Sequence, residues 1–79
     1  MKTVEYFGYE VTVPDNATHL AADSDGTVYT YIGEPILGED VWWPEYGLLE
    51  MISTCQQTDC PQLDMRSVNW RDSLKELKP

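Results

Sequence analysis

The sequence predicts a small α+β fold that is mostly β, an antiparallel sheet of four or five strands with a short C-terminal helix. Three observations predict it. β-Branched and aromatic residues alternate with polar ones over 3–13 and 27–32, as in half-buried strands. Turn-forming residues separate these runs. Near the C-terminus, apolar residues instead recur at the spacing of one helix face. With 79 residues, we expect a single small domain over 1–79.

The first predicted element is a hairpin that pairs residues 2–6 with 9–13. Val4 and Tyr6 alternate with Glu5, and the same alternation continues from Tyr9 onwards. Phe7-Gly8 lies between the two runs, and glycine supplies the positive φ that a tight turn can require. Pro14 cannot donate to a strand ladder and should end the second strand.

A second hairpin is predicted to pair residues 18–23 with 27–32. Asp25-Gly26 is a strong signal for a short hairpin turn between them. Asp23, Asp25, Thr27 and Glu34 also match positions 1, 3, 5 and 12 of a calcium-binding loop. Val28 stands where such a loop needs glycine for its sharp turn, so the hairpin is the favoured interpretation.

The remaining chain predicts a long connection, a few short elements and a helix. Residues 33–47 are rich in glycine and proline, with a short strand expected around Val41–Trp43. Residues 48–53 could be strand or helix, and their length favours a strand. Residues 54–64 are expected to form a loop. Residues 66–77 should wind as a short helix, capped by Ser67 or Asn69, that docks on the sheet.

The predicted core combines the inward positions of these strands with the apolar face of the helix. It includes one of the two adjacent tryptophans, Trp42 or Trp43, together with Val4, Tyr6, Val11, Val13, Leu20, Ala22, Val28, Ile32, Leu49, Ile52, Trp70 and Leu74.

The chain is acidic, and its charge is unevenly distributed. It carries 14 acidic and 5 basic residues, for a net charge of −9. Lys2 is the only base before Arg66. So few bases argue against direct binding to nucleic acid, and no apolar run is long enough to cross a membrane. The acidic surplus has three interpretations: solubility, which is the default, steering toward a basic partner protein, and mimicry of nucleic acid.

No pattern of residues indicates catalysis, a metal site or a cofactor. Cys55 and Cys60 lie in a sequence without a secretory signal, so we expect free thiols in a reducing cytosol. A disulfide between them and a metal half-site are the alternatives. His19, the only histidine, has no nucleophile or orienting group nearby in the sequence. We therefore expect a protein that is not an enzyme.

The most unusual segment is Trp42-Trp43-Pro44-Glu45-Tyr46. Adjacent tryptophans cannot both face the same side of a strand, so one should fill the core and the other should lie near the surface. Tryptophan and tyrosine commonly anchor protein interfaces, although both could simply cover a thin core. The candidate binding residues are these aromatic side chains and the acids around them, namely Trp42, Trp43, Tyr46, Glu34, Glu39, Asp40 and Glu45.

A series of short motifs extends across most of the chain. In chain order it consists of Val11-x-Val13-Pro14, Leu20-Ala21-Ala22-Asp23-x-Asp25-Gly26-x-Val28-Tyr29-x-Tyr31, Trp42 and Trp70-Arg71-Asp72-Ser73-Leu74. This ordered set resembles a group of small, mostly uncharacterised proteins encoded by tailed bacteriophages and prophages. The resemblance implies a phage accessory protein that acts in the cytoplasm of the bacterial host, and it implies no catalytic residues.

Two functions follow as expectations. The first is a non-enzymatic phage-type protein that binds a host protein with a basic surface, a candidate target being a defence or nucleic-acid-handling enzyme that it inhibits. The alternative is a structural or assembly protein, such as a minor virion component, that self-associates through sheet edges and aromatic side chains.

Overall fold

Antiparallel hairpins account for most of the regular structure in the computed structural model, which describes residues 1–44, 55–64 and 66–77. β1 (Lys2–Tyr6) pairs with β2 (Tyr9–Val13), and β3 (His19–Ala22) pairs with β4 (Val28–Tyr31). The first predicted hairpin is confirmed with its bounds, and the second is confirmed to within one residue at each end. The Asp23–Gly26 segment is a hairpin turn, in which the Gly26 N–H donates to the Asp23 carbonyl oxygen at 2.9 Å.

The central sheet has four strands in the order β7-β4-β3-β8, all antiparallel. β7 (Cys55–Gln57) lies where the sequence predicted only loop, so that prediction is wrong at these residues. The two predicted hairpins also do not share one sheet, because β1 and β2 form a separate two-stranded sheet. The mostly β, antiparallel class is confirmed.

The predicted helix over 66–77 is wrong. This segment contains one turn of 3-10 helix, η2 (Trp70–Asp72), followed by β8 (Lys75–Glu76), which pairs with β3. Asn69 caps η2 by accepting a hydrogen bond from the Arg71 N–H, as its short polar side chain favours. Short polar side chains compete with a longer helix for backbone hydrogen bonds, and the open edge of β3 offers the chain a better set of partners.

Ser73 joins this C-terminal segment to the central sheet. Its hydroxyl is buried and accepts a hydrogen bond from the Ala22 N–H at 2.9 Å, so it takes the place of a strand partner at the end of β3. The Leu77 N–H then donates to the Thr18 carbonyl oxygen at 2.8 Å, just beyond the β3–β8 pairing. The segment therefore closes one edge of the sheet.

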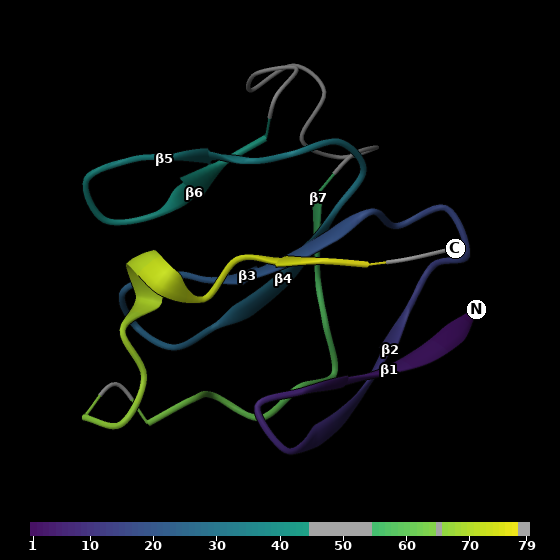
Figure 1. Ribbon diagram of the computed structural model, residues 1–79, viewed down its shortest axis with the longest axis horizontal. Helices are drawn as coiled ribbons and strands as arrows, with labels where there is room; N and C mark the ends of the chain where they lie inside the picture. Colours follow the sequence, from purple (N-terminus) through teal and green to yellow (C-terminus); the bar gives the residue numbers. More distant parts are fainter. Residues whose placement is uncertain (45–54, 65, 78–79) are drawn as a thin grey trace.

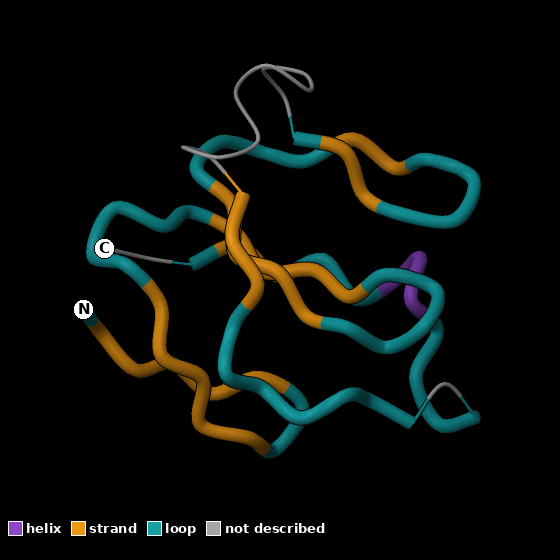
Figure 2. Tube along the Cα trace, turned by 180° about the vertical axis from the view of Figure 1, so that it is seen from behind, coloured by secondary structure: helices purple, strands orange, loops and turns teal. Residues whose placement is uncertain are grey.

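A third hairpin joins β5 (Ile36–Leu37) to β6 (Trp42–Trp43). β6 confirms the short strand predicted around Val41–Trp43, whereas β5 was not predicted. The strand predicted over 48–53 lies outside the described residues. Figures 1 and 2 show the central sheet between the β1–β2 hairpin on one side and the β5–β6 hairpin on the other.

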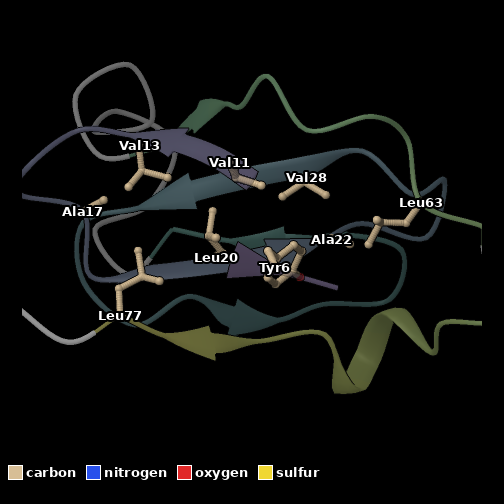
Figure 3. Packing of buried hydrophobic residues seen from close by; sticks show 9 residues of the cluster. All are labelled: Tyr6, Val11, Val13, Ala17, Leu20, Ala22, Val28, Leu63 and Leu77. Atoms are coloured by element: carbon tan, nitrogen blue, oxygen red, sulfur yellow. The ribbon is translucent and has the colours of Figure 1, made fainter. Parts of the chain in front are cut away.

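The central hairpin is buried on both faces. On one face, Leu20, Ala22 and Val28 pack with side chains of the β1–β2 hairpin (Figure 3), and the whole buried cluster is Tyr6, Val11, Val13, Ala17, Leu20, Ala22, Val28, Leu63 and Leu77. On the other face, Ala21 and Tyr31 pack with Trp42 in a second cluster. β3 and β4 are thus covered on both sides, which requires three layers of chain.

Most of the predicted core is confirmed, with differences in both clusters. Val4, Ile32, Trp70 and Leu74 are only half-buried, and Leu49 and Ile52 lie outside the described residues. The buried apolar residues that the sequence analysis omitted are Ala17, Ala21, Tyr31, Leu63 and Leu77. Ala21 and Tyr31 were omitted because strand alternation assigned them to an exposed face, and that face is covered by Trp42.

Candidate protein-binding surface

The β5–β6 hairpin carries three exposed large apolar side chains, of which Ile36 and Trp43 share one face and Leu37 lies on the other. Ile36 is 56% exposed, Leu37 is 47% exposed and Trp43 is 42% exposed. Ile36 lies directly opposite Trp43 across the two strands. In Figure 1 the hairpin lies at the rim of the molecule, with β6 toward the central sheet and β5 on the outer side. Adjacent exposed apolar side chains of this kind are typical of an interaction surface.

Trp42 holds the hairpin in place. Its indole is buried, and its Nε1–H donates to the Trp70 carbonyl oxygen at 3.2 Å. Its backbone N–H donates to Asp23 Oδ1 at 3.0 Å, and its carbonyl oxygen accepts from the Tyr31 hydroxyl at 3.3 Å. Hydrogen-bonding groups on three separate segments, two side chains and one backbone carbonyl, thus tie one residue of β6 to the body of the protein. Trp42 therefore positions the surface, and its neighbour Trp43 forms part of it.

Trp43 lies along the turn of the hairpin because residue 38 is glycine. A Cβ atom on Gly38 would come within 2.5 Å of Trp43 Nε1 and 2.6 Å of the Val41 carbonyl oxygen, so a larger residue would displace the indole. The Gly38 N–H donates to the Val41 carbonyl oxygen at 2.9 Å and closes the turn. The indole then forms one wall of a shallow hollow that Glu39, Asp40 and Val41 complete.

The carboxylates of this surface have no cationic neighbour among the described residues. Glu34, Glu39 and Asp40 are exposed, and the ion pairs in the described ranges join Met1 to Asp15 and Arg66 to Asp64. Unpaired carboxylates beside an exposed indole match a lysine or arginine side chain, because a cation gains both from the negative charge and from the aromatic face.

The turn between β3 and β4 adds negative charge behind the hairpin. The Ser24 N–H donates to the Asp40 carbonyl oxygen at 3.1 Å, so this turn and the hairpin tip are in contact. Burial raises the pKa of the Asp23 carboxyl, and the nearby Asp25 raises it further, whereas the hydrogen bond from the Trp42 N–H acts in the opposite direction. The turn therefore places the carboxyl groups of Asp23 and Asp25 close to the acidic tip of the hairpin.

The structure separates the residues that the sequence analysis proposed as a binding site. Trp43, Glu34, Glu39 and Asp40 are exposed on or next to the hairpin, and Trp42 is buried beneath it. Glu45 and Tyr46 lie outside the described residues. Sequence analysis missed Ile36 and Leu37, although two apolar runs separated by Gly38-Glu39-Asp40 are a recognisable hairpin signal.

The cysteines and the histidine form no chemical site with one another. Cys55 and Cys60 are unpaired, and they pack against the two different core clusters. Burial raises the pKa of both thiols, which disfavours the reactive thiolate. His19 is half-buried, with its Nδ1 2.8 Å from the hydroxyl oxygen of Thr18. Among the described residues, no group of three or more His, Cys, Asp or Glu side chains could hold a metal ion.

The comparisons with known proteins leave the class open. No known protein family, no curated protein and no solved structure matches this chain. Within the described ranges, no helix is long and apolar enough to cross a membrane.

Proposed function

We propose that this chain is a non-enzymatic, phage-type protein that binds a positively charged surface of a host protein through its β5–β6 hairpin. The observation that carries the proposal is the contrast between adjacent tryptophans. Buried Trp42 fixes the hairpin, and exposed Trp43 lies opposite Ile36, with exposed Leu37 on the same strand as Ile36 and with exposed carboxylates on or next to the hairpin.

The apolar side chains would supply most of the affinity. Tryptophan is enriched among the residues that dominate binding energy, and a rigid support lowers the entropy lost when it is immobilised. The carboxylates of Glu34, Glu39 and Asp40 would act mainly on the rate of association and on the choice of partner, because rim charges steer encounter more than they add affinity.

The negative charge also suggests which host protein is bound. An enzyme that handles nucleic acid has a basic surface for phosphates, and carboxylates on this protein would compete for it. Binding there would inhibit the enzyme, a defence nuclease being one candidate. The proposed place of action is the cytoplasm of the bacterial host.

The proposal is tested by capture from a bacterial lysate with matched variants of the protein as bait. Trp43→Ser should reduce the amount of the captured host protein about tenfold or more, as expected for a hot-spot residue. Phe7→Ser is the control, since Phe7 is 50% exposed at the tip of the β1–β2 hairpin, in a different sheet. Equal losses with both variants would contradict a binding role for the β5–β6 hairpin.

The role of charge needs a second matched pair. Glu39→Gln with Asp40→Asn removes two charges from the hairpin, and Glu5→Gln with Glu10→Gln removes two from the opposite pair on β1 and β2. We expect the first change to slow association at low salt more than the second. Equal rates would show that only net charge matters, and unchanged rates would remove the electrostatic part of the proposal.

Self-association is the second candidate, because the same exposed apolar hairpin could meet its copy. The net charge of −9 opposes it, since two copies repel at low salt. Sedimentation velocity at high protein concentration and high salt distinguishes the two. A dimer that Trp43→Ser dissociates would favour the assembly function.

A further inference from the structure

Among the residues that the structure describes, no strand pairs with the outer edge of β5. The Gly38 N–H donates to the Val41 carbonyl oxygen, which makes these two residues a hydrogen-bonded pair of the β5–β6 ladder. Pairs alternate in an antiparallel ladder, so Leu37 and Trp42 form a pair whose backbone groups point away from each other. The hydrogen bonds of Trp42 agree with this direction. Its backbone N–H donates to Asp23 and its carbonyl oxygen accepts from Tyr31, both on the side away from β5.

The N–H and carbonyl groups of Leu37 therefore point outward, away from β6. Among the described residues, no group donates to or accepts from the Leu37 backbone. The same position has an exposed side chain, and exposed Ile36 and Trp43 lie next to it. Native proteins generally protect open apolar edges with charge, proline or a covering segment. Here Pro35 precedes the strand, and Leu37 is left accessible.

We infer that this edge binds an extended, basic segment of the partner protein as a third strand beside β5, a mode of recognition that rests on the function proposed above. A residue of that segment opposite Leu37 would exchange two main-chain hydrogen bonds with it, one in each direction. Its neighbouring side chains would contact Ile36 and Trp43, and its cationic residues would lie among Glu34, Glu39 and Asp40.

Charge complementarity selects a basic segment of another protein over a second copy of this chain. The sequence around the edge contains no lysine or arginine from Thr3 to Met65, and the three exposed carboxylates have no cationic neighbour in the described ranges. A second β5 would bring its own Glu34, Glu39 and Asp40 against them, and like charges at such distances are unfavourable.

The test uses a synthetic peptide of alternating arginine and threonine, and the same peptide methylated on every backbone nitrogen. The two peptides have the same charge, but the methylated one cannot donate to the Leu37 carbonyl oxygen. We expect the unmodified peptide to bind the wild-type protein about fivefold or more tightly than the methylated one at low salt, as the loss of one hydrogen bond predicts.

Two variants locate the contact. Leu37→Pro removes the outward N–H that would donate to a peptide carbonyl oxygen, and proline is tolerated in an edge strand, so the affinity for the unmodified peptide should fall about fivefold or more. Leu37→Val is the control, because it keeps the N–H and should retain the affinity of the wild type for the unmodified peptide. Circular dichroism and the tryptophan fluorescence of the protein would establish that both variants are folded.

The outcomes separate this inference from the proposed function. Equal binding of both peptides to the wild type would overturn strand addition and leave charge-based binding intact. An affinity for the unmodified peptide that is unchanged in Leu37→Pro would place the added strand elsewhere and would also overturn the inference. Failure of the proposed function itself would appear in the capture experiment, as an equal effect of Trp43→Ser and Phe7→Ser.

Discussion

At the scale of single residues, hydrogen bonds to buried polar groups connect segments that are distant in the sequence. The Tyr6 hydroxyl is buried and donates to the Ser73 carbonyl oxygen at 2.6 Å, which joins the N-terminal hairpin to the segment after η2. Burial raises the pKa of Tyr6 to about 12, with the Ser73 hydrogen bond acting in the opposite direction. The neutral phenol is therefore strongly favoured in the folded state.

Tyr6→Phe should lower the free energy of unfolding at neutral pH by about 1–2 kcal/mol, because the Ser73 carbonyl group loses its buried partner. The effect should shrink in alkaline solution. Unfolded tyrosine ionises near pH 10 and folded Tyr6 only near 12, so the unfolded state binds fewer protons in this window and the wild-type stability falls as pH rises.

Urea unfolding of the wild type and Tyr6→Phe at about pH 8 and about pH 11 measures this difference. The burial that raises the pKa of Tyr29 and Tyr31 is common to both proteins, so the comparison isolates Tyr6. If the difference in free energy of unfolding between the two proteins were the same at both pH values, a buried, un-ionised Tyr6 hydroxyl would be contradicted.

At the scale of elements, the structure depends on close approaches between turns and the loops around them. The turn after β3 contacts the segment after β7, where the Leu63 N–H donates to the Gly26 carbonyl oxygen at 2.9 Å. Gly26 has a φ of +89°, and a Cβ atom there would collide with the Leu63 carbonyl oxygen. Gly8 has a similar φ of +83° but open space around it.

This pair of glycines gives a matched prediction. Gly8→Ala should lower the free energy of unfolding by about 1 kcal/mol, the ordinary penalty for a left-handed backbone conformation in a residue with a Cβ atom. Gly26→Ala should cost about 2–4 kcal/mol, because it adds the displacement of the Leu63 segment to the same conformational penalty. Thermal unfolding of both variants measures the difference, and equal losses would show that the Gly26–Leu63 contact contributes little.

At the scale of the whole molecule, net charge opposes folding. The charge of −9 is distributed over a small structure, and two ion pairs join the described residues. Repulsion between carboxylates is stronger in the compact state than in the unfolded chain, and salt screens it.

Raising sodium chloride from about 0.05 M to about 0.5 M should therefore increase the free energy of unfolding by about 1 kcal/mol. The double variant Glu5→Gln with Glu10→Gln is a useful control, since these two residues lie directly opposite each other on β1 and β2. It should be more stable at low salt and respond less to added salt. A fall in wild-type stability with salt would contradict the prediction.

Local sequence patterns determined the first two hairpins, the antiparallel class and most of the inward positions. Alternation and turn chemistry act between neighbouring residues, so they could be recognised around Phe7-Gly8 and Asp25-Gly26 before any contact was known. Opposite placement of Trp42 and Trp43 also followed from strand geometry alone.

Tertiary structure alone decided which tryptophan is buried, that Ala21 and Tyr31 are covered, and that the C-terminal segment pairs with β3 instead of forming a helix. These outcomes depend on contacts between residues far apart in the sequence. The Trp42 indole is hydrogen-bonded to the Trp70 carbonyl oxygen, and the Ser73 hydroxyl accepts from the Ala22 N–H. The candidate surface depends on both the local sequence and the tertiary contacts. Local composition determined its acids and aromatic residues, and only the packing of Trp42 decided that Trp43, Ile36 and Leu37 remain exposed beside them, because burial is a property of long-range contacts.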